Sequence, residues 1–183
     1  MKLTSGRIHL TAIALILVGA TVAGAGPSGA IFTTNADGTF VNGNVYDANE
    51  DVYLNGGPRP NATCTAAGLP DGVYVFQVTD PSGGTLLSMD DPEDRLVRVA
   101  DGVLVVDPTE VPPLTVHATS PVAGKCGGVT VQLAPFANTP NPGGEYKVWM
   151  TLLDDFNTVG GFVHSQSKTD NFKVVPSDTP PDD

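Results

Sequence analysis

The chain has 183 residues, 40% of them hydrophobic and 16% charged, and its formal net charge is −11 at pH 7. An acidic chain without a clustered basic stretch repels phosphate groups, so nucleic acid is excluded as a partner. The length is sufficient for one domain with a core of its own. The 21 glycines and 16 prolines divide the chain into short segments, which leaves almost no room for helices.

The first 25 residues have the three parts of a signal peptide. Lys2 and Arg7 precede an apolar run at residues 10–22, and an A-x-A cleavage site ends at Ala25. A transmembrane helix is the alternative, but the run is shorter than the ~20 residues that a bilayer requires. We therefore expect residues 1–25 to be removed and the protein to be secreted or held at the cell surface, with no membrane insertion after cleavage.

Short segments of alternating apolar and polar residues, separated by turn signals, fill the rest of the chain. In LPDGVYVFQVTDPSGG (69–84), Tyr74, Phe76 and Val78 share one face, as in a strand with one buried side. We predict inward-facing residues at Tyr74, Phe76, Val78, Val129, Val131, Leu133, Tyr146, Val148 and Met150. Strands are predicted at 31–34, 39–42, 45–47, 52–54, 73–79, 85–88, 95–100, 103–106, 114–119, 129–134, 146–152 and 172–175.

This pattern predicts one all-β domain over residues 26–175, either a sandwich or a barrel. Residues 103–106 are apolar on both faces, which indicates a central strand or a strand beneath a loop. Residues 176–183, PSDTPPDD, are expected to form a disordered acidic tail because they have nothing to bury.

Cys64 and Cys126 are the only cysteines. In an oxidising compartment an even pair is most simply a disulfide, and two buried free thiols are the alternative. The absence of a C-x-x-C motif and of a Cys/His cluster gives zinc or thioredoxin-type chemistry no support.

Asp47, Asn49 and Asp51 place side-chain oxygens at alternate positions, as at the start of a D-x-[DN]-x-[DN] calcium loop. The match then fails, because Val52 stands where the loop needs glycine and Pro58 where it needs glutamate. An EF-hand is excluded, and an irregular calcium site remains open. A second acidic group is expected to be a solvated turn; it comprises Asp90, Asp91, Glu93 and Asp94.

Trp149, the only tryptophan, alternates with the apolar residues of EYKVWMTL (145–152) and so shares the outer face with Lys147. A solvent-facing indole there would bind a sugar ring or a partner side chain. The alternatives are a bulge that shifts the register, or a loop such as residues 135–142 that covers the ring.

His117 and His164 have no acid or nucleophile at motif spacing, and His117 is expected on the polar face of a strand. Neither G-x-S-x-G nor H-E-x-x-H is present. We assign no catalytic residues and no cofactor apart from the open calcium site, and we expect no enzymatic activity.

Four blocks of the sequence resemble a family. They are DVYLNGGP (51–58), AAGLPDGVYVFQVTDPSGGTLLSMD (66–90), GGVTVQL with NPGGEYKVWMT (127–133 and 141–151) and SKTDNFKV (167–174). They resemble bacterial secreted proteins of unknown function with prealbumin-like or collagen-adhesin B-type domains, and L-P-D-G-x-Y is similar to a strand entry in adhesin repeats. The resemblance implies an all-β, antiparallel sandwich of the prealbumin-like or Ig-like kind, with about 8 to 12 short strands.

Many adhesin domains of this kind carry a crosslink between a lysine on the first strand and an asparagine on the last. Here residues 26–54 contain no lysine, although Asn171 matches the acceptor position. We therefore expect no such crosslink and expect the pair Cys64 and Cys126 to take its place.

Two functions follow as hypotheses. The first is a non-enzymatic secreted or cell-surface β-sandwich with a structural or adhesion role. The second is a small extracellular module, with or without bound calcium, that binds carbohydrate or protein through the face around Trp149. In either case the partner is an unknown extracellular protein or glycan.

Overall fold

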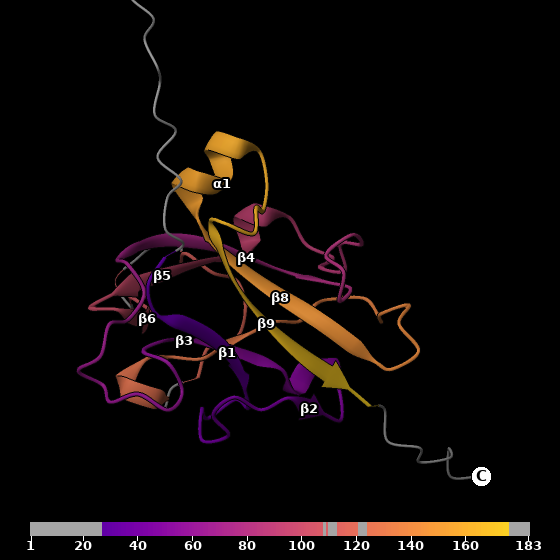
Figure 1. The fold of residues 1–183 in the computed structure, drawn as a ribbon, viewed down its shortest axis with the longest axis horizontal. Helices are drawn as coiled ribbons and strands as arrows, with labels where there is room; N and C mark the ends of the chain where they lie inside the picture. Colours follow the sequence, from indigo (N-terminus) through magenta and orange to yellow (C-terminus); the bar gives the residue numbers. More distant parts are fainter. Residues whose placement is uncertain (1–26, 108, 110–112, 121–123, 176–183) are drawn as a thin grey trace, which may run out of the picture.

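The computed structural model describes residues 27–107, 109, 113–120 and 124–175, which form two β-sheets and one helix (Figure 1). The signal-peptide and tail predictions lie outside these residues. The smaller sheet has the strand order β1-β3-β7, with β1 at Ala30–Thr34, β3 at Tyr53–Gly57 and β7 at Val131–Gln132. The chain is therefore β-rich, as predicted.

The larger sheet has six strands in the order β2-β9-β8-β4-β5-β6, and it curls. Its strands are β2 (Val45–Tyr46), β4 (Gly72–Thr79), β5 (Leu96–Ala100), β6 (Val103–Val105), β8 (Glu145–Leu152) and β9 (Ser167–Val174). Every strand pair is antiparallel except one, since β2 runs parallel to β9. The wholly antiparallel arrangement expected from the sequence is wrong at this edge.

The core lies between the two sheets and joins residues from both. Ile31, Leu54 and Val131 come from the smaller sheet, and Tyr74 and Phe76 are fully buried members from the larger one. The predicted inward-facing set is confirmed, with Val129 partly buried at the margin. The period-2 pattern identified these positions because a strand presents alternate side chains to one face.

The last strand is linked to the first. The Asp170 carboxylate on β9 accepts hydrogen bonds from the Thr33 backbone N–H of β1 at 2.8 Å and from the Thr33 hydroxyl at 3.3 Å. A side-chain contact thus connects the edge of the smaller sheet to the larger sheet.

Some predicted strands are not strands. Residues 39–42 form turns, with Asn42 at φ 58°, while 85–88 and 114–119 contribute only isolated bridges. Residues 103–106 are not central, because β6 is at the edge of its sheet. Leu104 is nevertheless buried, and its carbonyl accepts the Val129 N–H, so the strand lies beneath a neighbouring segment.

One helix was not predicted: α1, Leu153–Val159, follows directly from β8. Asp154 and Asp155 lie in its first turn, where negative charge complements the helix dipole. It ends at Gly160 in the left-handed conformation, whose N–H donates to the Phe156 carbonyl. Three short 3-10 helices cover Asn49–Asp51, Pro92–Asp94 and Lys125–Gly127. Across the described ranges, no helix is both long and apolar enough to cross a membrane.

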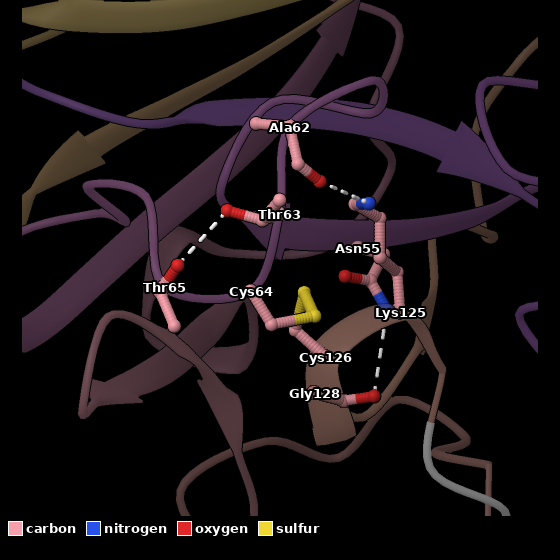
Figure 2. The surroundings of a disulfide bond; sticks show 8 residues. All are labelled: Asn55, Ala62, Thr63, Cys64, Thr65, Lys125, Cys126 and Gly128. Atoms are coloured by element: carbon pink, nitrogen blue, oxygen red, sulfur yellow. Dashed lines mark hydrogen bonds between the residues drawn. A yellow bond between two sulfur atoms is a disulfide. The ribbon is translucent and has the colours of Figure 1, made fainter.

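The two cysteines are joined, as predicted. Cys64 and Cys126 form a disulfide with Cα atoms 5.3 Å apart, which ties the loop after β3 to the Lys125–Gly127 turn (Figure 2). Lys125 Nζ donates to the Ala62 carbonyl at 3.0 Å beside it, and the Asn55 amide nitrogen reaches the Gly128 carbonyl from the other side. Covalent and polar links thus join the two loops at this corner of the fold.

Candidate functional site

An acid-lined groove of 430 Å³ lies at the β2 end of the molecule. Its lining includes two exposed apolar side chains, Phe40 and Val45, which are 54% and 56% exposed. Four carboxylates line it: Asp37, Asp47, Glu50 and Asp51. No lysine, arginine or histidine of the described chain lines it. We call this feature the acidic groove.

A turn network presents Phe40 to the groove. The Gly38 N–H donates to the Asn35 carbonyl, and the Phe40 N–H donates to the Asn35 side-chain oxygen at 2.9 Å. The Phe40 ring lies over Gly43, where an added Cβ would stand 2.5 Å from a ring carbon. The short polar residues thus fix the backbone so that an aromatic ring stays at the surface.

Asp37 supplies a charge that persists at low pH. Its carboxylate accepts hydrogen bonds from the Thr39 hydroxyl and from the Thr39 backbone N–H. These bonds stabilise the ionised form and lower the pKa of Asp37, the hydroxyl having the larger effect. The side chain is fully exposed, so Asp37 adds a negative charge to the groove while its hydrogen bonds to Thr39 hold the turn.

The proposed calcium ligands divide between two environments. Asp47 and Asp51 line the acidic groove, whereas the Asn49 amide nitrogen donates to the Phe136 carbonyl at 3.0 Å. In the described part of the chain, no three His, Cys, Asp or Glu side chains are close enough to hold a metal ion. Calcium binding at this loop stays a prediction.

The expected binding platform at Trp149 is wrong. The ring lies on the outer face of β8, as the alternation predicted, but it is only 5% exposed. Its Nε1–H donates to Thr79 Oγ1 at 2.9 Å, and Gly83 packs against the ring so closely that a Cβ there would stand 2.7 Å from it. A turn that follows β4 therefore covers the indole, which agrees with the alternative of a covering loop, although that loop is not the example given, residues 135–142.

Two further side chains complete this cover. The His164 ring packs edge-on against Trp149 with centroids 4.6 Å apart, and Lys147 Nζ lies 5.4 Å from the ring centroid. A stacked sugar would have to displace these residues. Lys147 and Trp149 are thus a packed pair and not an open binding surface.

His117 is also not where the sequence indicated. It is buried, while its neighbour Val116 is 70% exposed, so the alternation runs opposite to the expected one. His117 Nε2 lies 2.6 Å from Asp90 Oδ2, and Arg95 Nε lies 3.3 Å from Asp90 Oδ1. Asp90 therefore belongs to a buried charged cluster, and the solvated turn predicted there is wrong for this residue.

Comparisons with known proteins add no relative. No family model matches the chain, and neither the curated proteins nor the solved structures contain a match. The resemblance to adhesin-type domains therefore stays an expectation.

Phe40 is the residue of this candidate site that sequence reasoning missed. It was placed within a strand at 39–42, where its exposure would have depended on register. The available signal was composition, because NADGTFVNGN (35–44) contains six Asn, Asp or Gly residues, a density typical of turns. A turn segment lacks the sheet pairing that would place an aromatic side chain against the core, so the ring stays exposed.

Proposed function

We propose that the protein is a non-enzymatic, secreted or cell-surface β-domain of adhesion type, which holds an extracellular protein partner in the acidic groove. We further propose that its two sheets are a variant of the prealbumin-like or Ig-like sandwich. The disulfide supports an extracellular location, since such bonds persist in oxidising compartments. The carbohydrate alternative is not retained, because it depended on an exposed Trp149.

The observation that carries the proposal is the exposure of Phe40 and Val45 between four carboxylates. Exposed apolar side chains within a polar margin are characteristic of protein-binding surfaces. A segment rich in lysine or arginine would match both the carboxylates and the apolar side chains of the acidic groove. Its charges would pair with the carboxylates. Its alkyl stems or guanidinium planes would pack on the Phe40 ring.

The test is a titration of the protein with hexa-arginine and with hexalysine peptides. Binding is measured by calorimetry and by changes in the amide NMR shifts. We expect saturable binding with shifts concentrated at Phe40, Val45 and Asp47. Phe40→Ser should weaken binding about fivefold or more, as expected for an aromatic anchor. Absence of saturable binding, or shifts spread over the whole surface, would contradict the proposal.

A matched pair of variants separates local from general charge. Asp47→Asn with Asp51→Asn removes two charges from the acidic groove, and Asp154→Asn with Asp155→Asn removes two from α1. Figure 1 shows β2 and α1 at opposite ends of the fold. Only the first double variant should weaken peptide binding; equal losses in both would mean that net charge alone attracts the peptide.

A further inference from the structure

A second hollow lies where the chain just before β1, the loop after β3 and the start of β9 meet. Its volume is 510 Å³, and two of its lining residues are basic, Arg59 from the loop and Lys168 from β9. The other lining residues are small, being alanine, glycine, proline and serine. Of the described residues, no aspartate or glutamate lines it, and it shares no lining residue with the acidic groove. We call this feature the basic pocket.

The two cations of the basic pocket have no acidic partner. No carboxylate of the described chain forms an ion pair with Arg59 or Lys168. Burial lowers the pKa of Lys168, the positive charge of Arg59 lowers it further, and no carboxylate opposes the two effects. In a chain with 20 acidic and 9 basic residues, two neighbouring cations without a counter-charge favour an anion from outside the chain.

The walls of the basic pocket are fixed by covalent and polar links. Ser28 Oγ donates to the Gly68 carbonyl at 2.8 Å, which holds the chain before β1 against the loop after β3. Gly29, at φ 73°, approaches Gly68 so closely that an added Cβ would stand 2.5 Å from the Gly68 carbonyl carbon. Figure 2 shows Lys125 Nζ donating at 3.0 Å to the carbonyl of Ala62, a lining residue, beside the disulfide. A ligand thus finds the pocket already formed, which reduces the entropy lost on binding.

We propose that the basic pocket binds a small molecule through a phosphate monoester group, which lies between Arg59 and Lys168. The group carries about 1.5 to 2 negative charges at pH 7 and three acceptor oxygens, so it matches two cations better than a singly charged carboxylate or sulfate ester does. The guanidinium group donates in a planar fork, and the ammonium group adds a point charge. A volume of 510 Å³ lies within the range of small-molecule sites, so the pocket accommodates the body of the molecule as well as its phosphate.

The basic pocket is a local exception in an acidic chain. Arg59 and Lys168 lie in opposite halves of the sequence, so no basic stretch marks the site. Nucleic acid stays excluded, because two cations in a pocket do not form the extended basic surface that a phosphate backbone requires. The net negative charge repels anions at long range, but at about 0.15 M salt this repulsion is screened beyond about 8 Å. The pocket is separate from the acidic groove, so its test does not depend on the proposed function.

Glucose 6-phosphate, glucose 6-sulfate and glucose provide the test at constant ionic strength, because they share one ring and differ in charge. We expect glucose 6-phosphate to bind saturably in calorimetry and to shift the Lys168 side-chain and Ser28 amide signals in NMR. Glucose 6-sulfate should bind about tenfold more weakly, the difference that one charge-assisted hydrogen bond makes, and glucose should not bind. Inorganic phosphate should displace glucose 6-phosphate, because it carries the same charged group. Failure of that displacement, equal affinity for the two esters, or no saturable binding of glucose 6-phosphate would overturn the proposal.

Single-charge variants make the test specific to the basic pocket. Arg59→Gln and Lys168→Gln each remove one cation and should weaken binding of glucose 6-phosphate about tenfold or more. Lys173→Gln is the matched control, since it removes the same charge from the same strand but outside the pocket, where Lys173 lies 3.8 Å from Glu145. If Lys168→Gln does not fold, Arg59→Gln still decides, because Arg59 is exposed. An equal loss in all three variants, or unchanged affinity in either pocket variant, would overturn the proposal.

Discussion

Asp170 is a largely buried carboxylate that joins the first and last strands through Thr33. Burial raises its pKa above the ordinary value, and the hydrogen bonds from Thr33 oppose that rise only in part. Since the folded state favours the protonated acid, its stabilising contribution is full below the ordinary pKa. That contribution is lost as the pH rises through the raised value. At neutral pH the fold therefore carries a desolvated charge.

We expect Asp170→Asn to increase the free energy of unfolding most at neutral pH. Asparagine keeps an oxygen that can accept the Thr33 N–H but has no charge to desolvate. The change in unfolding free energy relative to the unaltered protein should be more favourable at pH 7 than at pH 4, as measured by urea unfolding. A difference of the opposite sign would show that the charge itself stabilises the contact.

Asp170→Ala is the companion variant, because it leaves the Thr33 N–H without an acceptor. It should lower the unfolding free energy by about 1 to 3 kcal/mol, the cost of an unsatisfied buried donor. Urea unfolding under the same conditions measures it. An effect near zero would mean that water replaces the carboxylate.

Trp149→Ala should behave as a core truncation. The indole is buried beneath Gly83 and bonded to Thr79, so its loss removes packing and leaves a cavity. We expect a loss of about 3 to 5 kcal/mol, similar to that of Phe76→Ala on the inner face of β4. Paired thermal unfolding curves compare the two variants, and a Trp149→Ala curve close to that of the unaltered protein would restore the exposed-platform model.

At the scale of elements, the disulfide links the loop after β3 to the Lys125–Gly127 turn. It closes a loop across a sequence separation of 62 residues, which corresponds to about 4 kcal/mol in the chain-entropy model. The double variant Cys64→Ser with Cys126→Ser should lose up to that amount. Hydrogen exchange should rise first at residues 58–69 and 124–128. Uniform exchange across both sheets would show that the disulfide supports the whole fold rather than this corner.

The sequence was sufficient for β4, β8 and the core, because alternation at Tyr74, Phe76 and Val78 depends only on local geometry. It identified only the end of β9, which begins at Ser167 whereas the predicted strand began at 172. The sequence was insufficient where one segment is compatible with either a strand or a turn. Residues 39–42 look like a strand, yet the hydrogen bonds of Asn35 and Asp37 turn the chain there. The cover over Trp149 was unpredictable for a different reason, since Gly83 and His164 reach it through tertiary packing.

The candidate sites were less predictable than the fold. The acidic residues Asp47 and Asp51 were identified as a group, but as metal ligands rather than as the margin of a groove. The cluster of His117, Asp90 and Arg95 brings together two segments that motif spacing does not connect. Such sites depend on non-local pairing of strands and loops, which a single sequence does not encode in any short motif.

For the whole molecule, the net charge of −11 adds a long-range attraction for basic partners. Binding of hexa-arginine should therefore weaken about fivefold or more when sodium chloride is raised from about 50 to about 500 mM, because salt shortens the Debye length. The contribution of Phe40 is a contact effect and should persist. Calorimetry of the unaltered protein and of Phe40→Ser at both salt concentrations tests this, and salt-independent binding would contradict an electrostatic groove.

The pairing of β2 with β9 limits the order in which the strands can pair during synthesis. The only sheet partner of β2 in the described structure is the last strand, and the Thr33–Asp170 contact spans 137 residues of sequence. As the chain leaves the ribosome, β1 can pair with β3, but β2 has no sheet partner and the Thr33 N–H has no carboxylate to bind until residues 167–174 have emerged. Contacts of such separation slow folding because a long loop must close first. A nascent chain would thus expose the unpaired β2 to chaperones until residues 167–174 have been synthesised.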